Sequence, residues 1–415
     1  MLEQFFDSPD HVQGLRNGPS GVLLEGFSQE LSHSGYAKAT ARRYIRAAVR
    51  FIHWADDEAI PTANFDEQAI AHFDEHLTQP QGSRYCRKER FDLLRGVRLF
   101  VGHVCGTGVN IGRAREPAPQ DPVLLARFHE WMREQRGTGD VTLANYSKPL
   151  RDLLKRVGED LRRLDAQSLR EFVLEQNQTL GAAGTKNCTA ALRMFARFLI
   201  AEGMCTAGLD AAVPVVAHWR LSSLPRYLQA EEVEGVIASC DTSSSVGKRD
   251  RAILLLLARL ALRASDVVQL RLADIDWKAA WISVSGKSRR ETQLPLTQEV
   301  GQAIVDYLQD GRPQSDSDAV FVRSLAPFRA FANQRAISAI VKQAMRRAGV
   351  TSPRRGAAHV LRHSAATSML RQGASLQDIA TILRHRSIES TQIYSKVDVA
   401  TLRRIAQPWP EVQPC

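Results

Sequence analysis

Apolar residues recur at helical spacing through most of the chain, and one helix is predicted around residues 40–52. Its apolar face consists of Tyr44, Ile45, Ala48, Val49 and Ile52. A second face carries three cations about one turn apart, Arg43, Arg46 and Arg50. Such a face is common on a solvated helix, but it also suits side chains that each neutralise one DNA phosphate.

The same two-faced pattern returns further along the chain. The apolar face of this second helix consists of Cys188, Leu192, Phe195 and Leu199. Its basic face carries Lys186, Arg193 and Arg197. Two equivalent basic faces in one chain favour contact with DNA phosphates over two solvated surfaces.

These helices belong to a weak internal repeat with an offset of about 100 residues. The matched positions, in order, are Val22 and Val123, Phe27 and Phe128, Tyr44 and Tyr146, Asp66 and Asp165, Phe73 and Phe172, and Phe100 and Phe198. We therefore predict one helical unit of about 85–90 residues that occurs twice.

The repeat and a later loss of periodicity predict the domain organisation. Residues 1–115 form an N-terminal helical domain, residues 116–207 a second helical domain, and residues 208–223 a linker bracketed by Pro214 and Pro225. Residues 224–415 form a third domain with a C-terminal tail. Within it, Trp281 to Ser285 alternates and residues 292–296 return as a partner strand. The predicted fold is mainly α-helical with a small β-hairpin in the C-terminal domain.

Composition narrows the classes of function. The chain has 415 residues, of which 44% are hydrophobic and 24% charged, as in folded globular proteins. Lys and Arg number 55 against 45 Asp and Glu, and the resulting net charge of +10 favours polyanionic partners. The longest apolar stretch, residues 252–262, is interrupted by Arg259 and too short to cross a membrane. With no secretory pattern at the N-terminus, we expect a cytoplasmic protein without membrane association. The six cysteines include no Cys-x-x-Cys pair, so we expect reduced thiols and no zinc site.

Candidate chemistry begins with cations of the C-terminal domain. Arg263 precedes a helix that Ser265 is expected to cap, and the helix amides and the guanidinium can face one anion together. Lys287 stands at the expected hairpin tip, where the charge continues with Arg289 and Arg290. Taken singly, an arginine paired with Asp266 and a lysine exposed on a turn are the simpler interpretations.

A group of cations follows in the next predicted helices. His359, Arg362 and His363 share one helical face. A zinc pair is not expected, because Val360 stands where the metalloprotease pattern has glutamate, and because Arg362 repels a cation.

The last predicted helices carry a histidine and a tyrosine. Ser375 and Asp378 form a capping box, and His385 lies just past the end of the helix that they open. Ser387 is expected to cap a further short helix with Tyr394 near its end.

In order, Arg263, Lys287, His359, Arg362, His385 and Tyr394 resemble the active-site set of the tyrosine recombinases, also called the phage-integrase family. Three spacings agree with bacterial members that resolve chromosome dimers: 24 residues from Arg263 to Lys287, 26 from His359 to His385, and 9 from His385 to Tyr394. The sequence also departs from the family twice, since Ala261 and Arg384 replace common glycines.

The resemblance implies site-specific DNA cleavage and rejoining through a 3′-phosphotyrosyl intermediate. Tyr394 would be the nucleophile, His359 would assist proton transfer, and Lys287 would protonate the leaving 5′ oxygen. Arg263 and Arg362 would hold the non-bridging oxygens, and His385 would donate a hydrogen bond to the phosphate. Neither a metal nor another cofactor is expected.

The resemblance also implies partners and an architecture. We expect double-stranded DNA recombination sites held in a C-shaped clamp, and a homotetramer on DNA or an assembly with sister recombinases. Leu402 and Ile405 would dock on a neighbouring copy or pack on their own domain. The enlarged N-terminal region favours an integrase or transposase of a mobile element over a housekeeping resolvase.

Three other interpretations remain open. The chain is a topoisomerase-like enzyme that cleaves without strand exchange, it is an architectural or regulatory DNA-binding protein, or residues 1–110 bind a protein partner while their arginines stay solvated.

Overall fold

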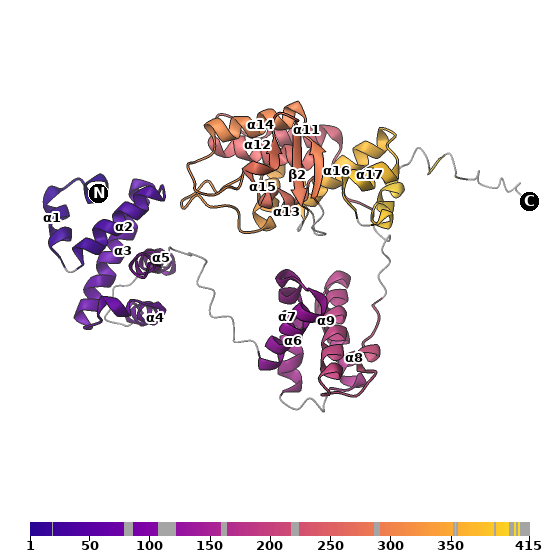
Figure 1. Ribbon diagram of the computed structural model, residues 1–415, viewed down its shortest axis with the longest axis horizontal. Helices are drawn as coiled ribbons and strands as arrows, with labels where there is room; N and C mark the ends of the chain where they lie inside the picture. The colour runs from indigo at the N-terminus through magenta and orange to yellow at the C-terminus, as the bar shows by residue number, and fades with distance from the viewer. Residues whose placement is uncertain are drawn as a thin grey trace, which may run out of the picture. The chain divides into compact units, whose positions relative to one another are not determined.

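The computed structural model describes all residues except 19, 79–85, 107–121, 159–163, 217–223, 286–290, 352, 354–355, 386, 398–401, 404–405 and 407–415. The described residues are mostly helical (Figure 1), with one small antiparallel sheet. Contacts divide the chain into residues 112–223 and the remainder, and each part is described by itself. The prediction of a mainly helical fold with a small sheet is confirmed. No helix within the described ranges is long and apolar enough to cross a membrane.

Residues 1–104 have a hydrophobic core of their own. The elements are η1 (Leu2–Gln4), α1 (Pro9–Asn17), α2 (Gly21–His33), α3 (Lys38–Asp57), η2 (Thr62–Asn64), α4 (Glu67–His76) and α5 (Arg87–Val104). Tyr44, Ile45 and Ala48 of α3 are buried, so the predicted apolar face forms part of this core.

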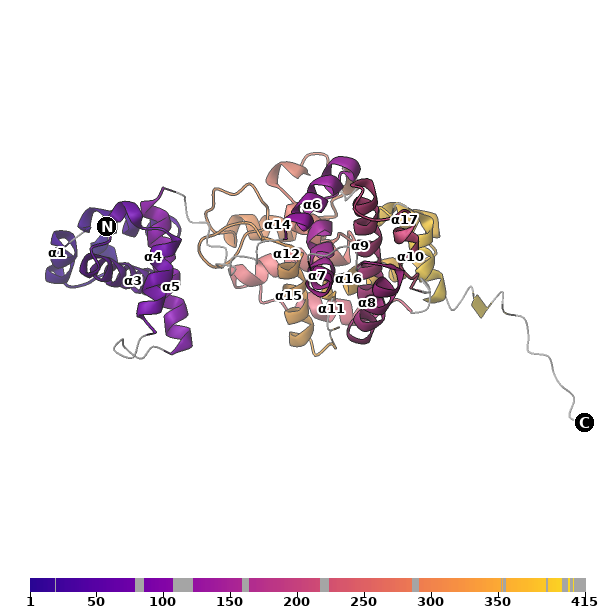
Figure 2. The ribbon, with the colours of Figure 1, turned by 90° about the horizontal axis from the view of Figure 1, so that it is seen from below.

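The second unit is a bundle of four longer helices and one short helix (Figure 2). They are α6 (Val123–Arg136), α7 (Asp140–Val157), α8 (Ala166–Thr179), α9 (Ala182–Ala201) and α10 (Leu209–Ala212). Leu209 and Val213 are buried in the core of the bundle. The expected linker therefore does not begin at residue 208, because this segment packs as part of the unit.

The predicted repeat has a structural counterpart. In the N-terminal part, Phe27 and Phe100 meet edge to face with ring centroids 5.5 Å apart. The matched residues of the second unit, Phe128 and Phe198, make the same contact at 5.7 Å. The helices α2 to α5 and α6 to α9 follow in the same order, and the matched residues Asp66 and Asp165 are the N-caps of α4 and α8. The two helical domains thus share the same edge-to-face phenylalanine contact in their cores.

The C-terminal part is built around a helix whose second half is apolar on every side. Its elements are α11 (Ala230–Ala238), α12 (Ser245–Ala258), α13 (Ala264–Gln269), η4 (Leu272–Asp274), β1 (Ile275–Asp276), β2 (Trp281–Ser285), β3 (Glu291–Pro295), α14 (Gln298–Asp310), α15 (Gln334–Arg347), α16 (Ala357–Arg371), α17 (Leu376–Ile382), η5 (Ile388–Ser390) and η6 (Gln392–Val397). Residues 252–257 of α12 are all buried, and α14 and α16 pack against this helix. A helical segment that is apolar all round, as in this half of α12, is the expected centre of such a core.

The sheet matches the predicted hairpin and extends it by one short strand. Strands β2 and β3 pair antiparallel, with Trp281 opposite Pro295, and β1 pairs along the other edge of β2. Ile282, Val284 and Leu294 are buried on one face of the sheet. The alternation that predicted the hairpin thus reflects one covered face.

Candidate active site

Arg263 is held at the start of α13. The prediction that Ser265 caps this helix is wrong: Arg263 is the N-cap residue, and its backbone N–H donates to Asp266 Oδ2 at 2.9 Å. The guanidinium of Arg263 donates to the carbonyls of Leu383 and Arg384 at 3.1 and 2.8 Å. These contacts tie the turn before α13 to the turn after α17.

Arg362 is on α16, only 4% exposed, and converges on the same turn. Its guanidinium donates to the carbonyls of Ala261 and Leu383. Burial lowers the pKa of Arg362 to about 9, and the positive charges of Arg263 and Arg384 add to this effect. Burial also lowers the pKa of Arg263. Three cations packed this closely, with Asp266 as the carboxylate that pairs with one of them, form a site that favours an anion.

Tyr394 lies in η6 and is 1% exposed. Its hydroxyl is 2.8 Å from Nδ1 of His363. Burial raises the pKa of Tyr394 to about 12, although the charge of Arg362 opposes this shift. Burial, together with the charges of His359 and Arg362, lowers the pKa of His363 to about 4. At neutral pH, a protonated phenol therefore faces a neutral imidazole that can accept its proton.

His363 is the site residue that was missing from the sequence-predicted set. The sequence placed it on one face with His359, which is exposed, and the two rings lie 5.7 Å apart. Which of the two histidines faces Tyr394 depends on a contact between segments 31 residues apart, which local periodicity does not contain.

His385 follows α17 and is held by the next turn. Its Nδ1 lies 2.7 Å from Oγ1 of the buried Thr391. Burial, followed by the charges of Arg362 and Arg263, lowers the pKa of His385 to about 4. The predicted Ser375 and Ser387 caps are both present, but the expected helix up to Tyr394 is divided into η5 and η6.

The structure brings together four of the predicted residues, namely Arg263, Arg362, His385 and Tyr394. Lys287, Arg289 and Arg290 lie outside the described residues. In the described part of the chain, no group of three or more His, Cys, Asp or Glu side chains is placed to hold a metal ion.

Both departures from the family pattern fall on left-handed backbone. Ala261 has φ of 50° and Arg384 has φ of 51°. Glycine adopts this region without steric cost, whereas other residues are strained there. The two turns that carry Arg263 and His385 therefore both begin from a strained residue.

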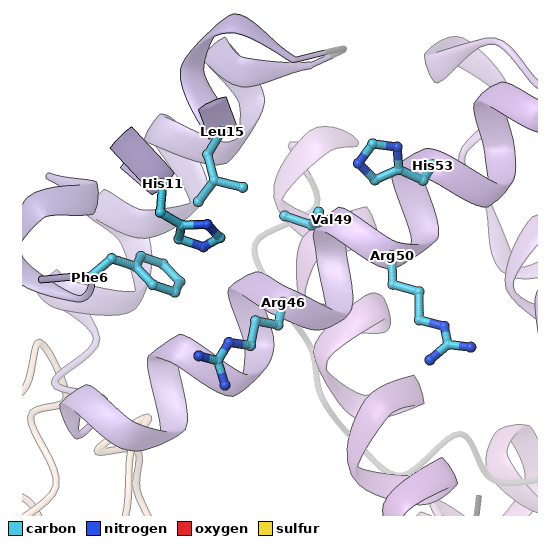
Figure 3. A pocket seen from close by; sticks show the side chains of 7 residues that line it. All are labelled: Phe6, His11, Leu15, Arg46, Val49, Arg50 and His53. Atoms are coloured by element: carbon cyan, nitrogen blue, oxygen red, sulfur yellow. The ribbon is translucent and has the colours of Figure 1, made fainter. Parts of the chain in front are cut away.

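The basic face of α3 lines a hollow of about 390 Å³. Figure 3 shows Arg46, Arg50 and His53 along α3, with Phe6 and His11 on the side of Arg46. The guanidinium of Arg46 lies over the Phe6 ring, 6.0 Å from its centroid. Arg43, further along the helix, forms an ion pair with Asp92 at 3.3 Å.

The basic face of α9 is partly occupied by the chain itself. Arg193 donates to the carbonyls of Val213 and Pro214 at 3.1 and 2.8 Å. Arg197 pairs with Asp210 at 2.9 Å, whereas Lys186 is exposed. Arg193 and Arg197 thus hold α10 and the residues after it against α9.

Comparison with known proteins shows which family this sequence matches. The family described as the phage integrase family matches residues 226–401, and the phage integrase N-terminal SAM-like domain matches residues 125–203. The putative integrase/recombinase y4rA of Sinorhizobium fredii is 36% identical over 95% of both chains. The chain belongs to the phage integrase family.

Other relatives of this integrase-family protein carry recombinase names. Tyrosine recombinase XerD of Lacticaseibacillus casei is 29% identical over 66% of this chain and 93% of its own length. Among solved structures, XerH site-specific recombinase bound to palindromic difH substrate matches with a TM-score of 0.54 and 18% identity, over 82% of this chain and 95% of that one. A lambda integrase dimer bound to a core site matches with a TM-score of 0.52 and 17% identity, over 70% and 79%. These structures show that the fold is shared.

A first prediction separates the two histidines of α16. In His363→Gln, the acceptor for the Tyr394 proton is lost, and we expect the rate of DNA cleavage to fall about 100- to 10,000-fold. His359→Gln serves as the matched variant on the same helix, and its rate should fall much less. Single-turnover cleavage at saturating DNA measures both. A larger loss of rate in His359→Gln than in His363→Gln would show that His359 is the proton acceptor.

The low pKa of His363 gives this prediction a pH signature. A bound phosphate is an opposite charge and raises the pKa of a histidine beside it. The acid limb of kcat/KM, which reports the free protein, should therefore lie near pH 4, and the acid limb of kcat should lie at higher pH. His363→Gln should reduce this difference to the part that comes from His385, whose pKa is also about 4.

Proposed function

We propose that this protein is a site-specific DNA recombinase that cleaves and rejoins strands through Tyr394. The observation that carries the proposal is the buried Tyr394 hydroxyl, which lies within hydrogen-bond distance of Nδ1 of His363, beside two converging arginines. A phenol, a proton acceptor and fixed positive charge are the groups that transesterification at a phosphodiester needs. The names of the relatives, integrase/recombinase and tyrosine recombinase, agree with this function.

The proposed reaction exchanges one phosphate ester for another. Oη of Tyr394 attacks the scissile phosphorus, and its proton passes to His363. The bond from phosphorus to the 5′ oxygen breaks, and Lys287 supplies the proton for that oxygen. Arg263 and Arg362 stabilise the charge that grows on the non-bridging oxygens, with a hydrogen bond from His385. The 5′ hydroxyl of a partner strand then attacks the phosphotyrosine and releases Tyr394, so no bond energy is lost to water.

Strand exchange requires several copies of the protein on two DNA sites. A solved lambda integrase is described as a tetramer bound to a Holliday junction, and it matches this chain with a TM-score of 0.52. We propose a homotetramer here, or an assembly with sister recombinases. Leu402 is 41% exposed and is a candidate docking residue, whereas Ile405 lies outside the described residues. An integrase or transposase of a mobile element, working in the cytoplasm where the DNA lies, is the proposed biological role.

The test uses a nicked suicide substrate drawn from the ends of the element that encodes the protein. Covalent protein–DNA complex is scored on a denaturing gel in the presence of EDTA, and we expect a band in the wild type. Two intact sites should then give Holliday junctions. A covalent band without junctions would indicate a topoisomerase-like enzyme, and tight binding without a band would indicate a DNA-binding protein.

We also propose that the predicted DNA-binding cations contact DNA phosphates. The set comprises Arg43, Arg46, Arg50, Lys186, Arg193 and Arg197 of the helical units and Arg289 and Arg290 of the C-terminal domain, which lie outside the described residues. The support is strongest for the exposed Arg46 and Lys186. In Arg46→Gln, the slope of log affinity against log salt should fall by about 0.9, the value for one lost phosphate contact. The matched variant Arg98→Gln, whose arginine pairs with Glu67, should leave the slope unchanged. An unchanged slope in Arg46→Gln would favour a protein partner for residues 1–110.

A further inference from the structure

Arg384 combines three features that each cost free energy. Its backbone is left-handed, its side chain is only 8% exposed, and its Nε and Nη1 atoms are buried with no acceptor among the described residues. Non-glycine residues in this region, buried charges and unpaired donors are all unfavourable. A glycine at this position would avoid all three costs. Costs of this kind persist where a side chain serves the function of a site.

The Arg384 side chain has one described partner. Its Nη2 donates to Oδ2 of Asp266, and that carboxylate is 3% exposed. The same Oδ2 accepts the backbone N–H of Arg263 at 2.9 Å. The backbone carbonyl of Arg384 in turn accepts from the Arg263 guanidinium at 2.8 Å. Arg384 therefore contacts two residues of the site. Its side chain binds the Asp266 carboxylate, and its backbone carbonyl accepts from the Arg263 guanidinium.

Asp266 is the carboxylate best placed to compete for Arg263. The two residues are three apart at the start of one helix, and the charge of Asp266 already acts on the Arg263 side chain. With Asp266 bound to Arg384, the Arg263 guanidinium contacts only carbonyls within the described part of the chain. The charge of a guanidinium held by neutral carbonyls remains available to an incoming phosphate. The charge of a guanidinium paired with a carboxylate is already neutralised by that partner.

We propose that Arg384 is a positioning residue that binds the Asp266 carboxylate and so keeps the Arg263 guanidinium available for the DNA phosphate. This inference rests on the proposed function. Its effect falls on the rate of cleavage and not on DNA affinity, because Arg384 acts through Asp266 and Arg263 and the contact that it protects is made at the scissile phosphate.

The experiment compares Arg384→Gln and Arg384→Lys in single-turnover cleavage of the suicide substrate at saturating DNA. The glutamine variant cannot neutralise Asp266, and we expect its rate to fall about 10- to 100-fold with DNA affinity unchanged. The lysine variant keeps the charge and should recover most of the rate. Arg249→Gln is the matched control, because Arg249 and Asp250 form another buried ion pair of the same domain, at 2.7 Å. Folded Arg249→Gln should cleave at the wild-type rate.

A second substitution makes the test specific. In Arg384→Gln with Asp266→Asn, the competing charge is removed while an acceptor for the Arg263 N–H remains, and we expect cleavage faster than in Arg384→Gln alone. A double variant no faster than Arg384→Gln would overturn the inference. Equal rates in wild type and Arg384→Gln would also overturn it and leave the proposed function intact. Absence of covalent complex in wild type would overturn both.

Discussion

Replacing Tyr394 by phenylalanine is expected to abolish the covalent protein–DNA complex. The substitution removes one oxygen, which is the proposed nucleophile, and leaves the buried ring in place. The other described contacts of the site, those of Arg263, Arg362 and His385, do not involve the hydroxyl. DNA affinity should therefore stay at the wild-type value while cleavage falls below detection.

The chain offers a matched control for this variant. Tyr307 is also 1% exposed, and its hydroxyl accepts the backbone N–H of Val322 at 3.3 Å, away from the proposed site. Tyr307→Phe deletes a buried hydroxyl in the same domain and should retain full cleavage in its folded fraction. Denaturing gels of the suicide-substrate reaction, read beside a DNA-binding titration, compare the two. A covalent complex in Tyr394→Phe would show that another residue is the nucleophile.

The second large effect is expected at Arg362. Arg362→Gln removes the more deeply buried of the two converging charges, and the cleavage rate should fall about 100- to 1,000-fold, as for a lost donor to a developing oxyanion. The charge matters only if the phosphate is charged. A substrate with a methyl group in place of one non-bridging oxygen at the scissile phosphate should therefore lose much less rate from this substitution.

Loss of folding is the alternative cause of a low rate in Arg362→Gln, because its guanidinium also anchors two carbonyls. Arg312 is the matched control. It donates to the carbonyls of Val320, Ser317 and Ala319 at 3.2, 2.6 and 3.0 Å and makes no contact with the proposed site. Arg312→Gln should lower thermal stability and leave the cleavage rate of the folded protein unchanged. Equal loss on the charged and the methylated substrates would contradict a phosphate-binding role for Arg362.

Local patterns predicted the elements well. The alternation at residues 281–285 gave β2 with its observed bounds, because one face of the sheet is covered and the pleat repeats every two residues. The capping box at Ser375 marked the start of α17 correctly. Strand β1 was missed because two residues carry no periodicity. The Ser265 cap was wrong because Asp266 binds the N–H of Arg263 and starts the helix earlier.

Long-range contacts were beyond the sequence. The chemistry-bearing residues were named from their order and spacing, but the partners of Arg263 at Leu383 and Arg384 lie about 120 residues away. The sequence marked Ala261 and Arg384 as departures from a glycine pattern, but it contained no sign that both backbones are left-handed. The resemblance assigned proton transfer to His359, whereas His363 is the histidine that meets Tyr394, because that contact depends on how η6 folds back on α16.

The burial of Tyr394 separates the search for a DNA site from the cleavage of DNA. A protein with its nucleophile at the surface would risk nicking every duplex along which it slides. Here the residue that carries the hydroxyl is buried and the hydroxyl pairs with His363, so the phosphates of non-specific DNA do not reach it. We expect that exposing Tyr394 to a phosphate costs free energy, which a correctly bound site would return and a non-specific site would not. The choice of cleavage site would then depend on the free energy of exposing Tyr394 as much as on the affinity for a DNA sequence.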